Sequence, residues 1–165
     1  MGLGNGIFYR KDFSKILFYF FISLFFIVSV SNSETLFKSQ YLPYELTWCI
    51  EKNKCLRLEV ANTPYERKIG LMNRPILIEN TAMIFLFDKP TDQKFWMFNT
   101  LNPLDIVFIK NNKIVHLEKN MPVCKKQPCR LYGPNQLYDY AIELNSGDIQ
   151  RLKINISDEV QLNVL

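Results

Sequence analysis

Asp105 is the acidic residue of this sequence whose surroundings most suggest chemistry. It lies within residues 104–109, an otherwise apolar run, and an unpaired charge there is costly. We therefore expect a partner for its carboxylate, and Arg74 is the candidate. Asp105 would then belong to a structural ion pair, or it would cap the turn beside Pro103. The functional alternative places it in a pocket as a catalytic acid or base, or as a hydrogen-bond acceptor.

Trp96 lies in an aromatic-rich run, residues 95–98, that could hold a planar ligand. Its ring could stack on a sugar or another flat molecule, while Asn99 supplies directional hydrogen bonds. Strand alternation puts Phe95 and Asn99 on one face and Trp96 on the other, so a strand buried on both sides is the alternative. The predicted ligand site is a shallow pocket made of Gly70, Arg74, Trp96, Asn99 and Asp105.

The residues for other common chemistries are missing or poorly placed. His116 is the only histidine, and a Ser-His-Asp or Cys-His mechanism would need it as the base. It shares a strand face with Ile114 and Glu118, which favours a half-exposed structural residue. No G-x-S-x-G, Walker or H-E-x-x-H motif is present. We predict no cofactor and no metal, and an enzyme is the less favoured class, with Asp105 as its weak catalytic candidate.

An apolar segment near the N-terminus, residues 16–30, is typical of an export signal. Three basic residues precede it, and Ser31 and Ser33 follow it as small residues suited to signal peptidase. A helix of this length spans about 22 Å, less than the ~30 Å hydrocarbon core of a bilayer, so cleavage is favoured over a permanent anchor. We predict export to a periplasmic, extracellular or lumenal compartment, with a membrane anchor as the alternative.

Four cysteines follow the apolar segment and predict disulfides in an oxidising compartment. Three pairings are possible. We favour the local ones, Cys49 with Cys55 and Cys124 with Cys129, because each pair brackets a polar turn. Loops this small contribute only about 2 kcal/mol to stability. A zinc site is disfavoured because zinc-binding thiolates need a reducing compartment and both spacings here are longer than C-x2-C.

Charge excludes further classes of partner. The chain has 165 residues and a formal charge of +4, but residues 1–33 carry three basic and one acidic residue, so 17 basic and 15 acidic residues remain, a net charge of +2. A nearly neutral domain is not suited to nucleic acid. The loop with Lys125, Lys126 and Arg130 could contact an anionic partner such as a membrane surface, although a solvated loop is the default interpretation.

Alternation of apolar and polar residues is the commonest pattern and predicts a mainly β (α+β), strand-rich fold. We divide the chain into residues 1–33, the signal peptide or membrane anchor, residues 34–55, a lead-in strand and turn, and residues 56–165, a single strand-rich domain. The strands expected in that domain cover residues 56–60, 83–87, 104–109, 113–117, 138–144, 149–156 and 160–165.

One segment departs from this pattern and predicts a short helix after the first core strand. Thr63 and Glu66 form a capping box, with Pro64 at the first helical position. Residues 65, 69 and 72 then lie on one face of the helix. The helix should end at residues 74–75, because a residue before proline resists helical geometry. Gly70 weakens the helix and indicates that another group approaches closely there.

The order of these segments resembles the domain of unknown function family numbered 192. Residues 83–87 resemble its GMLFxF strand, residues 95–100 its FWMKNT block, residues 103–109 its PLDIIFI strand and residues 143–147 its LELxAG turn. The resemblance covers about residues 56–164. It implies a compact, barrel-like, often exported domain with no established activity. Phe98 stands where the family usually has lysine, so no chemistry of that lysine is available here.

These observations predict an exported module that binds a small ligand or a component of the cell envelope. One alternative is an envelope enzyme that uses Asp105 as acid or base. Another is a structural accessory that residues 16–30 anchor to the membrane. The binding hypothesis requires that Arg74, Trp96 and Asp105 converge on one accessible cavity.

Overall fold

A computed structural model describes residues 38–165 of the chain. The predicted signal peptide or anchor, residues 1–33, lies outside the described residues. No helix of the described part is long and apolar enough to cross a membrane. In chain order the elements are β1 (Tyr44–Glu51), β2 (Lys54–Ala61), α2 (Pro64–Ile69), β3 (Thr81–Thr91), β4 (Phe95–Trp96), β5 (Leu104–Lys110), β6 (Lys113–Met121), β7 (Leu131–Tyr132), β8 (Tyr138–Asn145), α3 (Asp148–Arg151) and β9 (Leu162–Val164).

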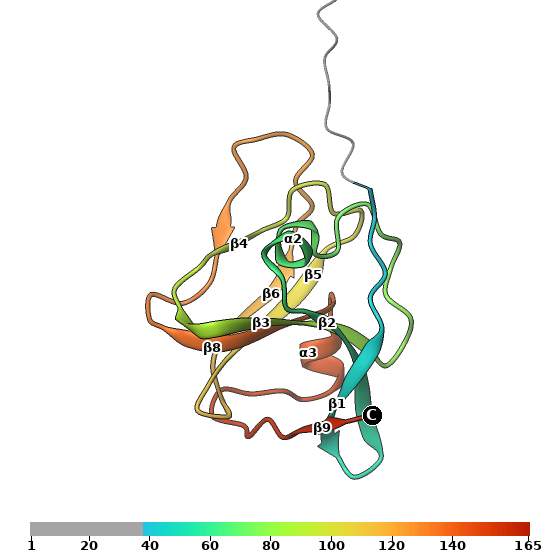
Figure 1. Ribbon diagram of the computed structural model, residues 1–165, viewed down its shortest axis with the longest axis vertical. Coiled ribbons are helices and arrows are strands. Elements are labelled where there is room, and N and C mark those ends of the chain that lie inside the picture. The colour runs from blue at the N-terminus through green and yellow to red at the C-terminus, as the bar shows by residue number, and fades with distance from the viewer. Residues whose placement is uncertain (1–37) are drawn as a thin grey trace, which may run out of the picture. The chain divides into compact units, whose positions relative to one another are not determined.

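Seven strands form one mixed sheet in the order β6-β5-β8-β3-β2-β1-β9 (Figure 1). Strands β2 and β3 pair in parallel, with α2 in the connection between them, and the other neighbours in the sheet are antiparallel. Strands β4 and β7 form a separate two-stranded ribbon. The strand-rich prediction is confirmed. Strand β1 lies in the predicted lead-in, residues 34–55, yet it is part of the main sheet.

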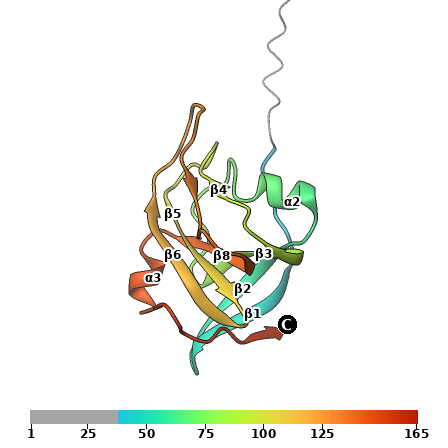
Figure 2. The same cartoon turned by 90° about the vertical axis from the view of Figure 1, so that its left-hand side faces the viewer.

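Two apolar cores lie on opposite faces of this sheet, one on the side of α2 and the other on the side of α3 (Figures 1 and 2). Alternation along β3 divides its side chains between them. Met83 and Phe85 belong to the core on the α2 side, and Ile84 belongs to the core on the α3 side. Strands β5 and β8 are buried on both faces too, which is why their sequences are apolar almost throughout.

The sheet is open and does not close into the barrel that the family resemblance implies. Its edges are β6 and β9. The segment before β9 reaches back to the start of β6: the Ile114 N–H donates to the Asp158 carbonyl at 3.0 Å, and the Val160 N–H donates to the Asn112 carbonyl at 2.8 Å. A few hydrogen bonds from this segment thus cover part of the β6 edge.

Helix α2 is the helix expected after the first core strand, and its capping box is confirmed. The Glu66 N–H donates to the Thr63 hydroxyl at 3.2 Å, and the Thr63 N–H donates to the Glu66 carboxylate at 2.9 Å. Ile69 and Met72 are buried. Tyr65 is 66% exposed, so it is not buried with these two residues.

The helix ends at Ile69, earlier than the predicted end at residues 74–75. Gly70 is the reason, because its φ of +48° interrupts the helix and favours glycine. A Cβ atom at this position would also lie 3.4 Å from the ring of Phe85. The expected close approach at Gly70 is therefore present.

A second short helix, α3, occupies part of residues 149–156, where we predicted a strand. Asp105 of β5 organises its start: one carboxylate oxygen accepts hydrogen bonds from the N–H groups of Gly147 and Ile149, both at 3.0 Å. Lys153 then takes a φ of 57° and turns the chain. The prediction failed because the helix start depends on a side chain from a distant strand.

Candidate ligand-binding site

Asp105 is a structural capping residue in this fold. Its side chain is 1% exposed. Besides the two bonds at the start of α3, it accepts a hydrogen bond from the Asn120 N–H at 2.8 Å. All three donors are backbone N–H groups, so the predicted ion pair between Asp105 and Arg74 is wrong. The expectation that the Asp105 carboxylate has partners is right. Catalysis by Asp105 stays a prediction that this arrangement does not favour.

Arg74 forms a buried pair with another acid, Glu59 of β2. Its two terminal nitrogens donate to the two carboxylate oxygens at 2.6 and 2.9 Å. The Leu42 N–H donates to the same carboxylate at 3.0 Å, and the ring of Tyr41 lies 4.2 Å from the guanidinium carbon. A bidentate pair of this kind fixes the segment after α2 against β2.

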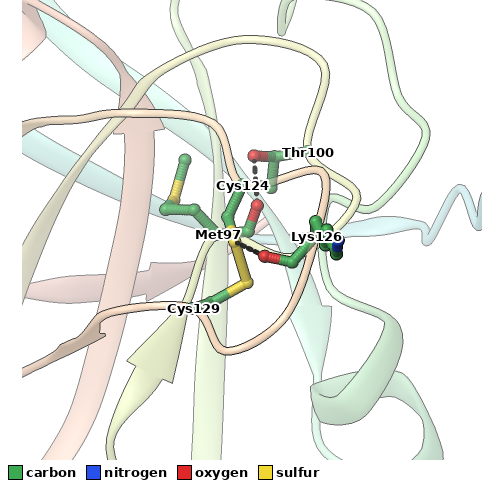
Figure 3. The surroundings of a disulfide bond; sticks show 5 residues. All are labelled: Met97, Thr100, Cys124, Lys126 and Cys129. Atoms are coloured by element: carbon green, nitrogen blue, oxygen red, sulfur yellow. Dashed lines mark hydrogen bonds between the residues drawn. A yellow bond between two sulfur atoms is a disulfide. The ribbon is translucent and has the colours of Figure 1, made fainter.

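Asn99 belongs to a backbone network beside a disulfide. Its N–H donates to the Cys124 carbonyl at 3.0 Å, and the Cys124 N–H donates to the Met97 carbonyl at 3.0 Å. The hydroxyl of Thr100 donates to the same Met97 carbonyl at 2.9 Å (Figure 3). The Cys124–Cys129 loop is thereby attached to the segment that follows Trp96.

Both predicted disulfides are present. Cys124–Cys129 has an S–S distance of 2.06 Å, and Cys49–Cys55 links β1 to β2. No free cysteine remains in the described chain. His116 is half-buried beside Glu118, with 3.0 Å between its Nε2 and the Glu118 carboxylate.

A cavity of about 480 Å³ lies between α2, the middle of β3 and the β4–β7 ribbon. Aromatic rings form much of its wall. Phe85 and Phe95 meet edge to face with their ring centroids 5.0 Å apart, and the ring centroid of Trp96 lies 5.4 Å from that of Phe98. The complete lining is Pro64, Arg67, Lys68, Phe85, Phe87, Gln93, Lys94, Phe95, Trp96 and Leu131. This volume and lining are typical of a site for a small organic molecule.

The charged residues that line this cavity are all basic: Arg67, Lys68 and Lys94. Backbone carbonyls hold two of them in place. Arg67 donates to the Leu86 carbonyl at 2.8 Å and lies over the ring of Phe87, and Lys94 donates to the Gly133 carbonyl at 3.0 Å. Fixed positive charge without a lining acid favours an anionic ligand.

A narrow recess of about 30 Å³ adjoins the cavity, and Phe85, Phe95 and Trp96 line both. Gly70 also lines the recess, so two of the five predicted site residues lie together there. Arg74, Asn99 and Asp105 line neither the cavity nor the recess. Ligand binding by those three stays a prediction.

Glu143 of β8 also lines this recess and is the site residue that the sequence reasoning missed. It is 5% exposed, and burial raises the pKa of its carboxyl to about 8. The signal was available, because Glu143 lies in the apolar run 140–144 as Asp105 lies in its own. An acid in an apolar strand needs either a partner or a function.

Comparisons with known proteins bear on the same part of the chain. The model of DUF192, an uncharacterised family, matches residues 47–162. A UPF0127 protein from Thermococcus sibiricus is 29% identical over 110 residues, covering 66% of this chain and 67% of that protein.

Two crystal structures have a similar fold. A protein of unknown function from Novosphingobium aromaticivorans matches with a TM-score of 0.62 and 29% identity, over 71% of this chain and 83% of its own. A protein from Sinorhizobium meliloti, named as a proposed transcription regulator, matches with a TM-score of 0.64 and 26% identity, over 77% of this chain and 98% of its own. Each match covers more than two thirds of this chain.

Proposed function

From the premise that the chain belongs to the uncharacterised DUF192 family, we propose that its domain binds a small organic anion with a flat apolar body. The observation that carries this proposal is the cavity of about 480 Å³ between α2 and the β4–β7 ribbon. Its aromatic wall suits a flat body, since rings stack or pack edge to face on one another. Its basic residues suit the anionic group.

The geometry gives less support to the other candidate functions. An enzyme that used Asp105 would need its carboxylate free for substrate, and three backbone N–H groups occupy it. A purely structural accessory would not need an aromatic cavity with a basic lining. Nothing in the described residues favours a nucleic-acid partner, and the regulator name of one similar protein applies to that protein.

We also propose that the domain meets this ligand outside the cytoplasm. The two disulfides support an oxidising compartment, and residues 16–30 have the composition of an export signal. The ligand would then be a component of the cell envelope or of the surrounding medium.

Binding can be tested with naphthalene-2-sulfonate, a flat aromatic anion, followed through the tryptophan indole N–H signals in ¹⁵N NMR spectra. The chain has two tryptophans, and Trp48 is buried in the core on the α3 side, so Trp48→Phe assigns the Trp96 signal. We expect a saturable shift of the Trp96 signal, with the Trp48 signal unchanged, because only Trp96 lines the cavity.

A negative charge introduced at the cavity wall provides the matched comparison. Leu131 is 60% exposed and lines the cavity, so Leu131→Asp should weaken binding about tenfold by repulsion and lost apolar contact. Ile156 is 51% exposed and lies outside the cavity lining, so Ile156→Asp should leave the affinity unchanged. A Trp96 signal that does not saturate, or equal losses in both variants, would contradict the proposal.

A further inference from the structure

We infer that the ligand carries a small uncharged polar group that enters the recess beside the cavity and forms a hydrogen bond with the carboxyl group of Glu143. This inference rests on the proposed function and adds a requirement to the ligand's chemistry. It concerns a residue that lines the recess, whereas the basic residue Lys94 lines only the cavity.

The position of Glu143 in the sheet directs its side chain toward the recess. It lies opposite Met83 of β3 and Ile106 of β5, and both of these neighbours belong to the core on the α2 side. Residues opposite one another in a sheet share a face. The carboxyl group therefore projects from the sheet face that α2 covers, where the recess lies.

The carboxyl group of Glu143 makes no hydrogen bond or ion pair with any residue in the described range 38–165. The other two acids of this sheet that are almost fully buried are well paired, Asp105 with backbone N–H groups and Glu59 with Arg74. Burying a polar group without a partner costs on the order of 1–3 kcal/mol. Such groups are rare in native proteins and point to a functional role.

The recess has the size of a single small group. Its volume of about 30 Å³ is close to the share of one water molecule in the liquid. A hydroxyl or an N–H group fits this space, and an aromatic ring does not. Because Phe85, Phe95 and Trp96 line both spaces, a ring held in the cavity can direct a substituent into the recess.

The charges around Glu143 favour an uncharged group over a cation. Arg67 and Lys68 of α2 are the charged residues besides Glu143 that line the recess, and both would repel a ligand cation. The neighbouring strands contribute Met83 and Ile106, which are uncharged. Since burial raises the pKa of Glu143 to about 8, its carboxyl is mostly protonated at neutral pH and can both donate and accept.

The test compares two probes of nearly equal size, 6-hydroxynaphthalene-2-sulfonate and 6-methylnaphthalene-2-sulfonate. Their substituents lie at the opposite end of the ring system from the sulfonate, so the sulfonate can meet Lys94, which lines the cavity and not the recess, while the substituent enters the recess. With the full chain at pH 7 and the Trp96 indole signal as readout, we expect the hydroxyl probe to bind about tenfold more tightly than the methyl probe.

Substitutions at Glu143 assign the preference to its carboxyl group. Glu143→Leu should reduce the hydroxyl-to-methyl affinity ratio to about one, whereas Glu143→Gln should retain most of it because an amide also donates and accepts. The exposed residue Glu79 provides the control, and Glu79→Leu should keep the tenfold ratio.

The outcomes separate the two proposals. If neither probe, nor unsubstituted naphthalene-2-sulfonate, shifts the Trp96 signal, both the proposed function and this inference are overturned. If the probes bind with equal affinity, or if the preference for the hydroxyl survives in Glu143→Leu, the role of Glu143 is overturned while the binding cavity stands. The comparison of probes in the unaltered chain needs no variant to fold.

Discussion

Two acids on adjacent strands illustrate how burial alone does not determine what a carboxyl group does. In the β5–β8 ladder Asp105 is opposite Leu144, and the next pair joins Ile106 to Glu143. The two acids consequently point to opposite faces of the sheet. Asp105 meets backbone N–H groups on its face, while Glu143 meets apolar side chains and the recess.

The raised pKa of Glu143 predicts how this residue makes the stability of the fold depend on pH. Its pKa is about 8 in the folded chain and near 4.5 in the unfolded chain, so between these values the folded state binds more protons. The stability that the neutral carboxyl provides is therefore complete below about pH 4.5 and is lost as pH rises to 8.

Glu143→Gln removes this titration and keeps the shape of the side chain. We compare the free energy of unfolding of this variant with that of the unaltered chain at each pH. We expect the difference, variant minus unaltered chain, to be on the order of 3 kcal/mol larger at pH 8 than at pH 5. Urea unfolding at both pH values measures this difference. Glu79→Gln, at an exposed acid, should gain nothing. A constant difference between Glu143→Gln and the unaltered chain would show that the carboxyl is ionised at both pH values.

Helix α3 depends on Asp105, so a substitution there should act on that element. Asp105→Asn replaces the carboxylate that accepts three backbone hydrogen bonds, one of them fully buried, by an amide, and we expect a loss of about 2–3 kcal/mol in free energy of unfolding. Hydrogen exchange should accelerate at Gly147 and Ile149. Binding of naphthalene-2-sulfonate to the folded variant should not change, because Asp105 does not line the cavity. Lost binding with unchanged stability would instead restore the catalytic or ligand-binding role.

The elements that could be predicted from the sequence are those with local causes. The capping box of Thr63 and Glu66 involves residues three apart, and it predicted the start of α2 correctly. The start of α3 could not be found in the same way, because Asp105 lies 42 residues from Gly147. The residues of the candidate site likewise divide into those with local and those with long-range causes. Trp96 was predicted from its aromatic neighbours, but its place beside Gly70 and Glu143 depends on how three separate segments fold together.

At the scale of the whole molecule, the order of the strands in the sheet could not be predicted from the alternation of apolar and polar residues. Periodicity indicates that a segment is a strand, and a hairpin turn indicates an antiparallel neighbour. Neither signal indicates that β8 lies between β5 and β3, or that β9 pairs with β1. These long-range pairings create the two cores, and with them the cavity on the α2 side.

The predicted export signal and the four cysteines together predict the redox state of the protein. If residues 16–30 direct export, the four cysteines oxidise outside the cytoplasm, so the exported protein, unfolded in denaturant, should contain no free thiol. If the signal is cleaved, the sequence of the mature protein should begin after Ser31 or Ser33, as N-terminal sequencing can show.

Phe20→Arg with Phe21→Arg interrupts the apolar segment and should leave the chain in the cytoplasm with four free thiols. Phe8→Arg with Phe13→Arg adds the same charges before that segment and should be exported and oxidised normally. Four free thiols in the unaltered chain would contradict export into an oxidising compartment and leave the cavity to meet a cytoplasmic ligand.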